Sequence, residues 1–368
     1  EHQAVALEAA RQSIVLLKNQ DNLLPLQKTL KSVVVIGPNA DEQKELICRY
    51  GPANAPIKTV YKGIKEALPE AKVVYKKGCE IVDPNFPESE VLPFDITPKE
   101  QQMMEEAITA AKEAEVVIMV LGGSEVTVRE ERSRTSLDLP GRQEELLKVM
   151  CQLGKPVVLV MIDGRASSIN YAKKYVPAIL HAWFPGEFCG QAVAETIFGD
   201  NNPGGRLSVT FPKSVGQIPF AFPFKPGSDS GCGTSVTGAL FPFGHGLSYT
   251  TFGYSNLKIS PEQQGVLGDV KVSCTVKNTG KRDGGEVVQL YLRDEVSSVT
   301  TYVKVLRGFE RITLQPGEEK VVTFTLRPQD LAIWDKNMKF QVEPGTFKVM
   351  VGASSKDIKL EGKFKINR

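Results

Sequence analysis

Residues 116–146 read VVIMVLGGSEVTVREERSRTSLDLPGRQEEL, and this stretch decides the fold of the first part of the chain. It opens with an unbroken apolar run, 116–121, which is typical of a strand buried on both faces of a parallel sheet. The run stops at Gly122-Gly123, and a loop crowded with charges follows until Leu139-Pro140-Gly141 opens a helix. Because ligands of open α/β sheets bind just beyond the carboxyl ends of the strands, this loop is the first place to look for chemistry. The alternative is a solvated loop whose charges pair with one another.

Strand and helix patterns alternate on both sides of this stretch. The strand-like segments are 32–37, 73–76, 115–121, 157–162 and 178–184, and helical patterns lie near 64–68, 99–112, 142–153 and 191–198. Thr97 and Pro98 supply a cap and a first-turn proline, and Gly154 and Gly199 stand where helices should stop. Such alternation predicts an α/β sandwich with a mostly parallel sheet and helices on both faces, over residues 31–212.

The chain starts with a helical pattern that has no start signal. Leu7, Ala10, Ile14 and Leu17 recur at helical spacing, without an N-cap before them. We therefore expect residues 1–30 to be a linker helix that leaves a domain preceding residue 1.

The second part of the chain has a different pattern. Residues 213–252 are rich in Gly, Pro and aromatic residues and are predicted to form an irregular connector. Short period-two runs follow at 270–276, 287–292, 303–309, 321–326, 340–342, 347–351 and 358–364, with turn signals between them. They predict an antiparallel β-sandwich of immunoglobulin or fibronectin type III kind over 253–368. Its Trp334 is interpreted as a core or interface aromatic, with a sugar-stacking role as the alternative.

Composition excludes several classes of protein. The net charge is +2, from 45 basic and 43 acidic residues, which gives no electrostatic case for nucleic acid or an anionic membrane. No apolar run approaches the roughly twenty residues that span a bilayer. The six cysteines form no CxxC pair and have no close spacing to any of the three histidines, which argues against a zinc or thiol redox site.

Other candidate sites are weak. The turn IGPNA, 36–40, lacks a phosphate-binding motif and is interpreted as a tight strand–helix turn. His181 lies inside an apolar strand, where a satisfied core histidine is the better interpretation. Ser124 lacks the second flanking glycine of a nucleophile elbow.

Ordered motifs run through the whole chain. They are AARQSIVLLKN (9–19), LLPL (23–26), IGPNA (36–40), LDLPG (137–141), FPG (184–186), FGDNNPGGRL (198–207) and PFGHGLSYTTF (242–252). In this order they resemble the C-terminal half of a family 3 glycoside hydrolase, the β-glucosidase and β-xylosidase group. In that family an N-terminal (β/α)8 barrel comes first, so the resemblance implies a barrel domain before residue 1.

The resemblance implies a retaining exo-β-glycosidase acting on terminal non-reducing sugars, with an oligosaccharide or an aryl or alkyl β-glycoside as substrate. This chemistry uses two carboxyl groups about 5–5.5 Å apart, one as nucleophile and one as general acid/base. In the family the nucleophile is an Asp of the barrel, and the acid/base is a Glu in a loop that reads roughly E-G-x-D-R. The matching stretch here is Glu130-Glu-Arg-Ser-Arg134.

Glu130 is therefore the candidate general acid/base, with Glu125 as runner-up and Glu131 after it. Glu131 and Ser133 replace the Gly and Asp of the family pattern, so the path of the loop is expected to differ. Arg134 stands at the Arg of the pattern, where it either contacts the sugar or pairs with a loop carboxylate. Without the barrel, this chain is predicted to be inactive.

Several further expectations follow from the resemblance. No metal or organic cofactor is implied. The sugar is glucose or, alternatively, xylose, and a periplasmic or secreted location is favoured. A non-catalytic, carbohydrate-associated structural module is the second class of function.

Overall fold

A computed structural model describes residues 1–43, 51, 56–228 and 235–368. The chain divides into two compact units, the first comprising residues 1–205 and 211–215 and the second residues 206–210 and 216–368. Within the described residues, no helix combines the length and the apolar character needed to cross a membrane.

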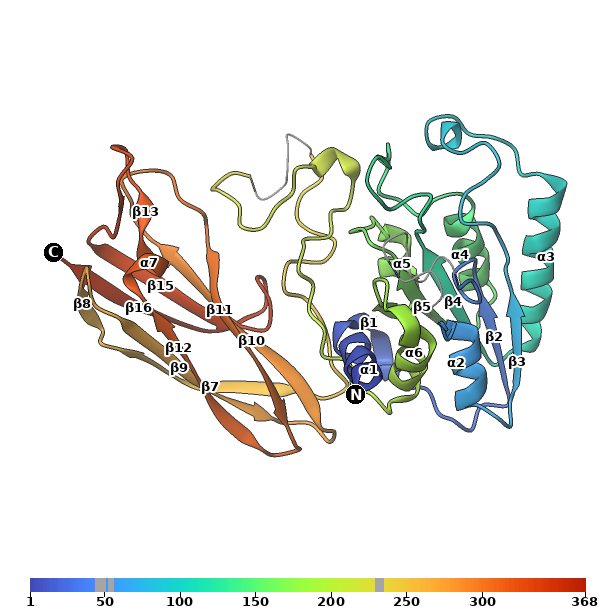
Figure 1. The fold of residues 1–368 in the computed structure, drawn as a ribbon, viewed down its shortest axis with the longest axis horizontal. Coiled ribbons are helices and arrows are strands. Elements are labelled where there is room, and N and C mark those ends of the chain that lie inside the picture. The colour runs from blue at the N-terminus through green and yellow to red at the C-terminus, as the bar shows by residue number, and fades with distance from the viewer. Residues whose placement is uncertain (44–50, 52–55, 229–234) are drawn as a thin grey trace. The chain divides into compact units, whose positions relative to one another are not determined.

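The first unit contains a six-stranded sheet with the strand order β1-β6-β5-β4-β2-β3 (Figure 1). Its strands are β1 (Val15–Asn19), β2 (Ser32–Ile36), β3 (Lys72–Lys76), β4 (Val116–Gly122), β5 (Val157–Ile162) and β6 (Ala178–His181). All neighbouring strands are parallel except β1, which runs antiparallel to β6. The predicted mostly parallel sheet is confirmed.

Helices cover both faces of this sheet. They are α1 (His2–Ser13), α2 (Val60–Ala67), α3 (Pro98–Glu113), α4 (Gln143–Gln152), α5 (Asn170–Tyr175) and α6 (Cys189–Phe198). Helices α1 and α2 each contact α6, while α3 and α5 each contact α4, so the helices form two groups (Figure 1). This arrangement is the one expected for right-handed crossovers between parallel strands.

The predicted helix signals are present at α3 and α6. Thr97 and Glu100 form a capping box, in which Thr97 N donates to Glu100 Oε2 at 2.8 Å and Glu100 N donates to Thr97 Oγ1 at 3.3 Å. Helix α6 is capped at its C-terminus by Gly199, whose φ of 82° lies in the left-handed region that favours glycine.

One local prediction for the first unit is wrong. The N-terminal helix stops at Ser13, and Leu17 belongs to β1. Residues 14–17 are buried on all sides, so the apolar run is satisfied as a sheet strand rather than as one face of a helix. The IGPNA turn is tight, with Ala40 N donating to Gly37 O at 3.2 Å, and the next helix that the structure describes begins at Val60.

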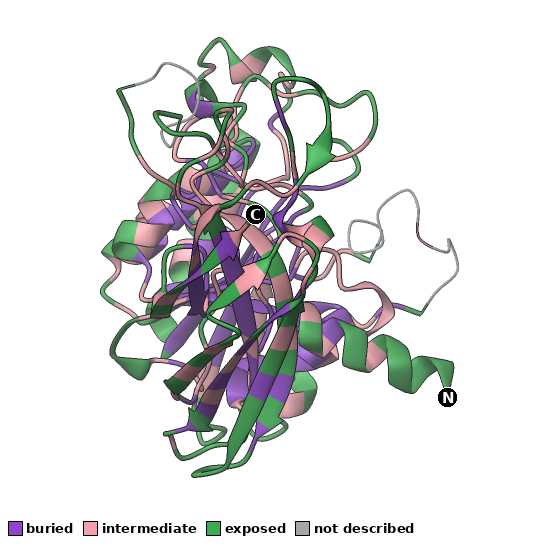
Figure 2. Ribbon diagram, turned by 90° about the vertical axis from the view of Figure 1, so that its left-hand side faces the viewer, coloured by how far each residue is buried: buried purple, intermediate pink, exposed green. Residues whose placement is uncertain are grey.

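The second unit contains a β-sandwich of two sheets, ordered β11-β10-β15-β16-β8 and β12-β9-β7, and a small ribbon, β13-β14. The strands are β7 (Phe252–Ser260), β8 (Gln263–Gly265), β9 (Val270–Asn278), β10 (Gly284–Asp294), β11 (Val305–Leu314), β12 (Glu319–Leu326), β13 (Ile333–Trp334), β14 (Phe340–Gln341), β15 (Gly345–Gly352) and β16 (Ile358–Asn367), with a short helix, α7 (Pro328–Leu331). Buried and exposed residues alternate along many of these strands (Figure 2), as the period-two pattern predicts. All the ladders are antiparallel except the short one between β8 and β16.

Most of the predicted connector and Trp334 lie in the second unit. Residues 216–252, most of the predicted connector, belong to the second unit. Trp334 is 59% exposed, so it is not a core residue.

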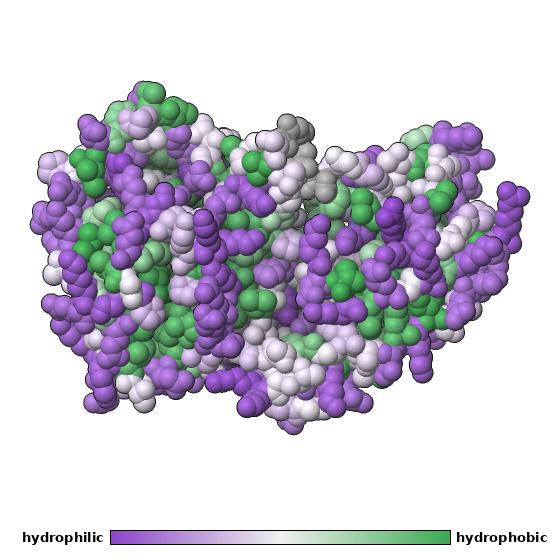
Figure 3. Space-filling model, turned by 180° about the vertical axis from the view of Figure 1, so that it is seen from behind, coloured by the Kyte–Doolittle hydropathy of each residue, from purple (hydrophilic) through white to green (hydrophobic). Residues whose placement is uncertain are grey.

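Hydrophobic patches lie among a mostly hydrophilic surface on the face drawn in Figure 3.

Candidate functional site

The charged loop begins where the strand order of the first sheet reverses. From β2 the chain passes outward to β3, returns to β4 beside β2, and then continues to β5 on the other side. Ligands of such sheets bind in the crevice at this switch point, beyond the carboxyl ends of the strands. The turns after β2 and β4 meet there, because Asn39 Nδ2 donates to Gly123 O at 2.9 Å.

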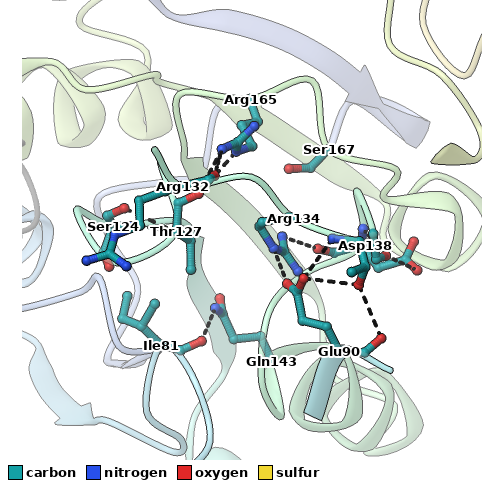
Figure 4. A network of polar contacts seen from close by, with 12 residues as sticks. Ile81, Glu90, Ser124, Thr127, Arg132, Arg134, Asp138, Gln143, Arg165 and Ser167 are labelled. Atoms are coloured by element: carbon teal, nitrogen blue, oxygen red, sulfur yellow. Dashed lines mark hydrogen bonds and ion pairs between the residues drawn. The ribbon is translucent and has the colours of Figure 1, made fainter. Parts of the chain in front are cut away.

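The start of the loop is fixed by Gly122 and Gln143. Gly122 has a φ of +142°, and a Cβ at this position would lie 2.0 Å from Ile162 O, so no other residue fits without a shift. The buried Gln143 side chain accepts from Gly122 N and donates to Gly122 O, both at 2.8 Å, and also donates to Ile81 O at 3.1 Å (Figure 4). These contacts therefore fix the backbone of Gly122, where β4 ends and the loop begins.

The next residues form a compact turn around Ser124, which is fully buried. Thr127 N and Val128 N both donate to Ser124 O, at 3.0 and 2.8 Å, and Ser124 Oγ accepts from Val126 N at 3.1 Å. Ser124 therefore serves the backbone of the turn. Glu125, the runner-up acid/base, forms an ion pair with Arg129 at 3.2 Å.

Arg165 reaches the loop from the residues that follow β5. Its Nε and Nη2 each donate to Thr127 O at 3.1 Å, and Nη2 also donates to Arg132 O (Figure 4). These two carbonyl groups lie on either side of Glu130 in the sequence. One guanidinium group thus ties together both ends of the segment that carries the candidate acid/base.

The far end of the loop is held by Arg134. Its Nε forms an ion pair with Glu90, and its Nη1 donates to Asp138 O at 2.9 Å. The Arg134 and Glu90 side chains are only 6% and 7% exposed, and Glu90 also accepts from Thr135 N at 2.9 Å. Arg134 was predicted either to contact the sugar or to pair with a carboxylate of its own loop. Its contacts are those of the second role, except that the carboxylate, Glu90, comes from a different loop.

Glu130 itself is exposed, and it makes no hydrogen bond or ion pair with any residue that the structure describes. The neighbouring Glu131 is also exposed and has a φ of 61°. This is the left-handed conformation that glycine favours, and Glu131 occupies the glycine position of the E-G-x-D-R pattern. The loop keeps a glycine-like backbone there in spite of the substitution.

Two buried titratable groups lie behind the loop. Asp163 accepts hydrogen bonds from Arg165 N at 3.2 Å and from the Ser167 hydroxyl. Burial raises the pKa of Asp163, although these hydrogen bonds lower it in part. His181 is fully buried, as predicted, and burial lowers its pKa to about 4, although the backbone of Arg165 opposes this shift. Its Nδ1 accepts from Trp183 N at 3.3 Å, while Nε2 has no hydrogen-bond partner among the described residues, so His181 is a core histidine but not the fully satisfied one that was predicted.

Glu90 and Arg165 were not predicted from the sequence as parts of this site. Arg165 follows β5 closely, so the rule that sites form beyond carboxyl strand ends could have indicated it. Nothing in the sequence indicated Glu90, which ends a short 3-10 helix (Glu88–Glu90) in the long connection between β3 and α3.

Metal-binding residues do not gather in the part of the chain that the structure describes, where no group of three or more His, Cys, Asp or Glu could hold an ion. Cys79, Cys151, Cys189 and Cys274 are free thiols. Cys48 and Cys232 lie outside the described residues.

Residues 14–249 match the model of the glycosyl hydrolase family 3 C-terminal domain. The chain belongs to glycosyl hydrolase family 3. Residues 286–355 match the fibronectin type III-like domain, which agrees with the β-sandwich of the second unit. The resemblance found in the ordered motifs is therefore confirmed.

Similar proteins are glycosidases of about twice this length. A β-xylosidase of Formosa agariphila is 44% identical over 97% of this chain and 49% of its own length, and a periplasmic β-glucosidase of Salmonella typhimurium is 40% identical over 99% and 50%. The structure of a β-glucosidase from Erythrobacter marinus matches with a TM-score of 0.91 at 35% identity, over 100% of this chain and 50% of that one. This family 3 chain spans about half the length of the curated relatives it matches.

Proposed function

We propose that this chain supplies the general acid/base of a retaining exo-β-glycosidase, and that Glu130 is that residue. The catalytic nucleophile would be an Asp on a (β/α)8 barrel domain joined to this chain. The observation that carries the proposal is the state of Glu130, an exposed carboxyl group without a partner among the described residues, on a loop tied down on both sides.

In the first step, the Glu130 carboxylic acid donates its proton to the glycosidic oxygen while the Asp attacks the anomeric carbon. The bond to the leaving alcohol breaks, and a covalent glycosyl-enzyme forms. In the second step, the Glu130 carboxylate removes a proton from water, which attacks the anomeric carbon and releases the Asp. The same residue therefore acts first as an acid and then as a base.

A general acid that works near neutral pH needs a site from which water is largely excluded. Glu130 is exposed in this chain. We propose that the barrel domain covers the loop and places the nucleophile about 5–5.5 Å from the Glu130 carboxyl group. This requirement is the reason why the chain without a barrel is expected to be inactive.

The test is Glu130→Gln in the full-length protein, meaning this chain joined to its barrel domain. Turnover of an aryl β-glycoside with a poor leaving group should fall about 10²–10⁴-fold, because the proton donor is lost. With dinitrophenyl as leaving group, the first step needs little acid assistance and should change far less.

Glu131→Gln and Glu125→Gln are matched controls, since each removes one carboxylate from the same loop. Both should retain the turnover and the leaving-group dependence of the unchanged protein. If Glu125→Gln shows the selective loss and Glu130→Gln does not, the role passes to Glu125.

Xylose is the second candidate sugar, because a 44% identical relative is a β-xylosidase and a 40% identical one is a β-glucosidase. A panel of aryl β-glucosides and β-xylosides on the full-length protein decides between them by kcat/KM. The periplasmic relative likewise supports a periplasmic or secreted location, which cell fractionation tests.

A non-catalytic role for the chain makes the opposite prediction for activity. If the full-length protein hydrolyses none of the panel, the enzymatic proposal fails. If this chain by itself hydrolyses an aryl β-glycoside at a comparable rate, the assignment of the nucleophile to a separate barrel fails.

A further inference from the structure

We propose that Arg165 is a positioning residue, whose guanidinium group fixes the segment carrying Glu130 and so sets the direction of the acid/base carboxyl group. This inference rests on the proposed function of Glu130. It adds a residue that comes from a different strand and that does not touch the substrate.

Arg165 contacts the backbone on both sides of Glu130 in the sequence. Thr127 O receives both Nε and Nη2, and Arg132 O receives Nη2. A planar guanidinium group can hold two backbone carbonyls at a fixed spacing, and its charge strengthens each hydrogen bond. Arg165 thus bridges the two ends of the segment from Thr127 to Arg132, and Glu130 lies in the middle of this segment with its side chain exposed.

Arg165 is itself held in place by buried groups. Its backbone N–H donates to Asp163 Oδ1 at 3.2 Å, and the other oxygen of Asp163 accepts from Ser167. Asp163 is 3% exposed and directly follows β5. The guanidinium group is therefore connected to the central sheet through a short, buried turn.

The loop also packs directly on this turn. A Cβ built on Gly123 would lie 2.6 Å from a Val128 methyl group and 2.7 Å from Asp163 Oδ1. A Cβ on Gly164 would lie 2.7 Å from the other Val128 methyl group and 2.8 Å from the Phe184 ring. The Val128 side chain thus fills the space between Gly123 and Gly164, and this close packing fixes the position of the loop on the sheet.

Positioning matters because the acid must lie within about 2.6–3.2 Å of the glycosidic oxygen. A displacement of about 1 Å can lower the rate about 10²-fold. Without Arg165, the Thr127 and Arg132 carbonyl groups lose their hydrogen bonds to the turn after β5, while Glu130 and its charge remain.

The experiment compares Arg165→Ala and Arg165→Lys in the full-length protein. Arg307→Ala is the matched control, because Arg307 Nε donates to a backbone carbonyl, Asp330 O, at 2.6 Å in the second unit. For Arg165→Ala, kcat/KM, which reports the first step, should fall about 10–100-fold for a poor leaving group and less than about threefold for dinitrophenyl glycosides. Arg165→Lys retains the charge but lacks the fork, so it should show a smaller loss with the same leaving-group selectivity.

A double variant separates positioning from general damage. In the Glu130→Gln background there is no proton donor to misplace, so adding Arg165→Ala should lower kcat/KM for a poor leaving group further by less than about twofold. Arg307→Ala should leave the leaving-group dependence unchanged. These results support the inference.

Equal losses for good and poor leaving groups, or the same factor in both backgrounds, would overturn the positioning role while leaving Glu130 as the acid/base. If Arg165→Ala does not fold, Arg165→Lys decides: kinetics identical to the unchanged protein overturn the inference. Failure of the proposed function is seen separately, as normal turnover in Glu130→Gln alone.

Discussion

Two glutamates connected with the same loop have opposite environments. Glu90 is buried and holds Arg134 and Thr135, whereas Glu130 is exposed and has no partner among the described residues. The contacts that fix the loop lie at Thr127, Arg132 and Arg134, and they leave Glu130 untouched. One carboxylate carries the structure of the loop, and the other remains available for chemistry.

This division has a physical reason. A carboxylate beside an arginine is stabilised in its ionised form, which is unsuitable for a group that must donate a proton. An acid/base therefore needs a rigid support that does not itself bind the carboxyl group. Arg134 and Arg165 provide such a support by binding Glu90 and backbone carbonyls.

The largest expected effect on stability comes from Glu90→Ala. It leaves the Arg134 guanidinium buried without its counter-charge, and breaking a buried pair in this way costs about 3–5 kcal/mol. Urea unfolding of the first unit measures the loss through Trp183 fluorescence in a Trp334→Phe background, since these are the only two tryptophans.

Lys28→Ala is the control for Glu90→Ala, because the Lys28–Asp200 pair is half exposed. Its cost should not exceed about 1 kcal/mol. Equal costs for the two variants would remove the distinction between a structural and an available glutamate.

Asp163 extends the comparison to a carboxyl group that is buried behind the loop. Burial raises its folded pKa above the ordinary value of 3.8, so the folded protein holds this proton more tightly than the unfolded chain. The contribution of Asp163 to the free energy of unfolding is fully present below pH 3.8. It is lost as the pH rises from there through the raised pKa of the folded protein. Unfolding free energies measured against pH should therefore fall less steeply above about pH 4 in Asp163→Asn. A steeper fall in the variant would contradict the sign of the shift.

A small gain is expected from Glu131→Gly. The left-handed φ of 61° is unfavourable for glutamate by about 1–2 kcal/mol, and glycine loses about 0.5–1 kcal/mol more in chain entropy on folding. The net gain in unfolding free energy should be about 0.5–1 kcal/mol, with turnover retained. A loss of stability would show that the Glu131 side chain contributes to the loop.

The smallest expected effect on stability is that of Glu130→Gln. The side chain is exposed and without a partner among the described residues, so the unfolding free energy should change by no more than about 0.5 kcal/mol. A catalytic loss without a stability loss is the opposite of what is expected for Glu90→Ala. A drop of several kcal/mol would place Glu130 among the structural residues.

Much of the fold could be predicted because local patterns and tertiary structure agree. The apolar run of β4, the capping box at Thr97 and the alternating strands of the sandwich each carry their own signal. β1 could not be separated from a helix, since a short apolar run beside a helical pattern fits both.

The candidate site was only partly accessible to sequence reasoning. The loop and Glu130 followed from the strand end and the family pattern. The clamp by Arg165 and the pairing of Arg134 with Glu90 connect residues that are 33 and 44 positions apart, and such contacts depend on how the chain folds. The left-handed conformation of Glu131 also depends on these contacts at both ends of the loop.

Azide rescue of Glu130→Ala in the full-length protein tests the role of Glu130 most directly. With a dinitrophenyl glycoside, the glycosyl-enzyme forms without acid assistance and accumulates, because no base activates water. Azide needs no base, so it should restore turnover and give a glycosyl azide of β configuration, while Glu131→Ala should give only the free sugar. A Glu130→Ala protein that turns over normally without azide, or that forms no β-glycosyl azide, would contradict the assignment of Glu130 as the general acid/base.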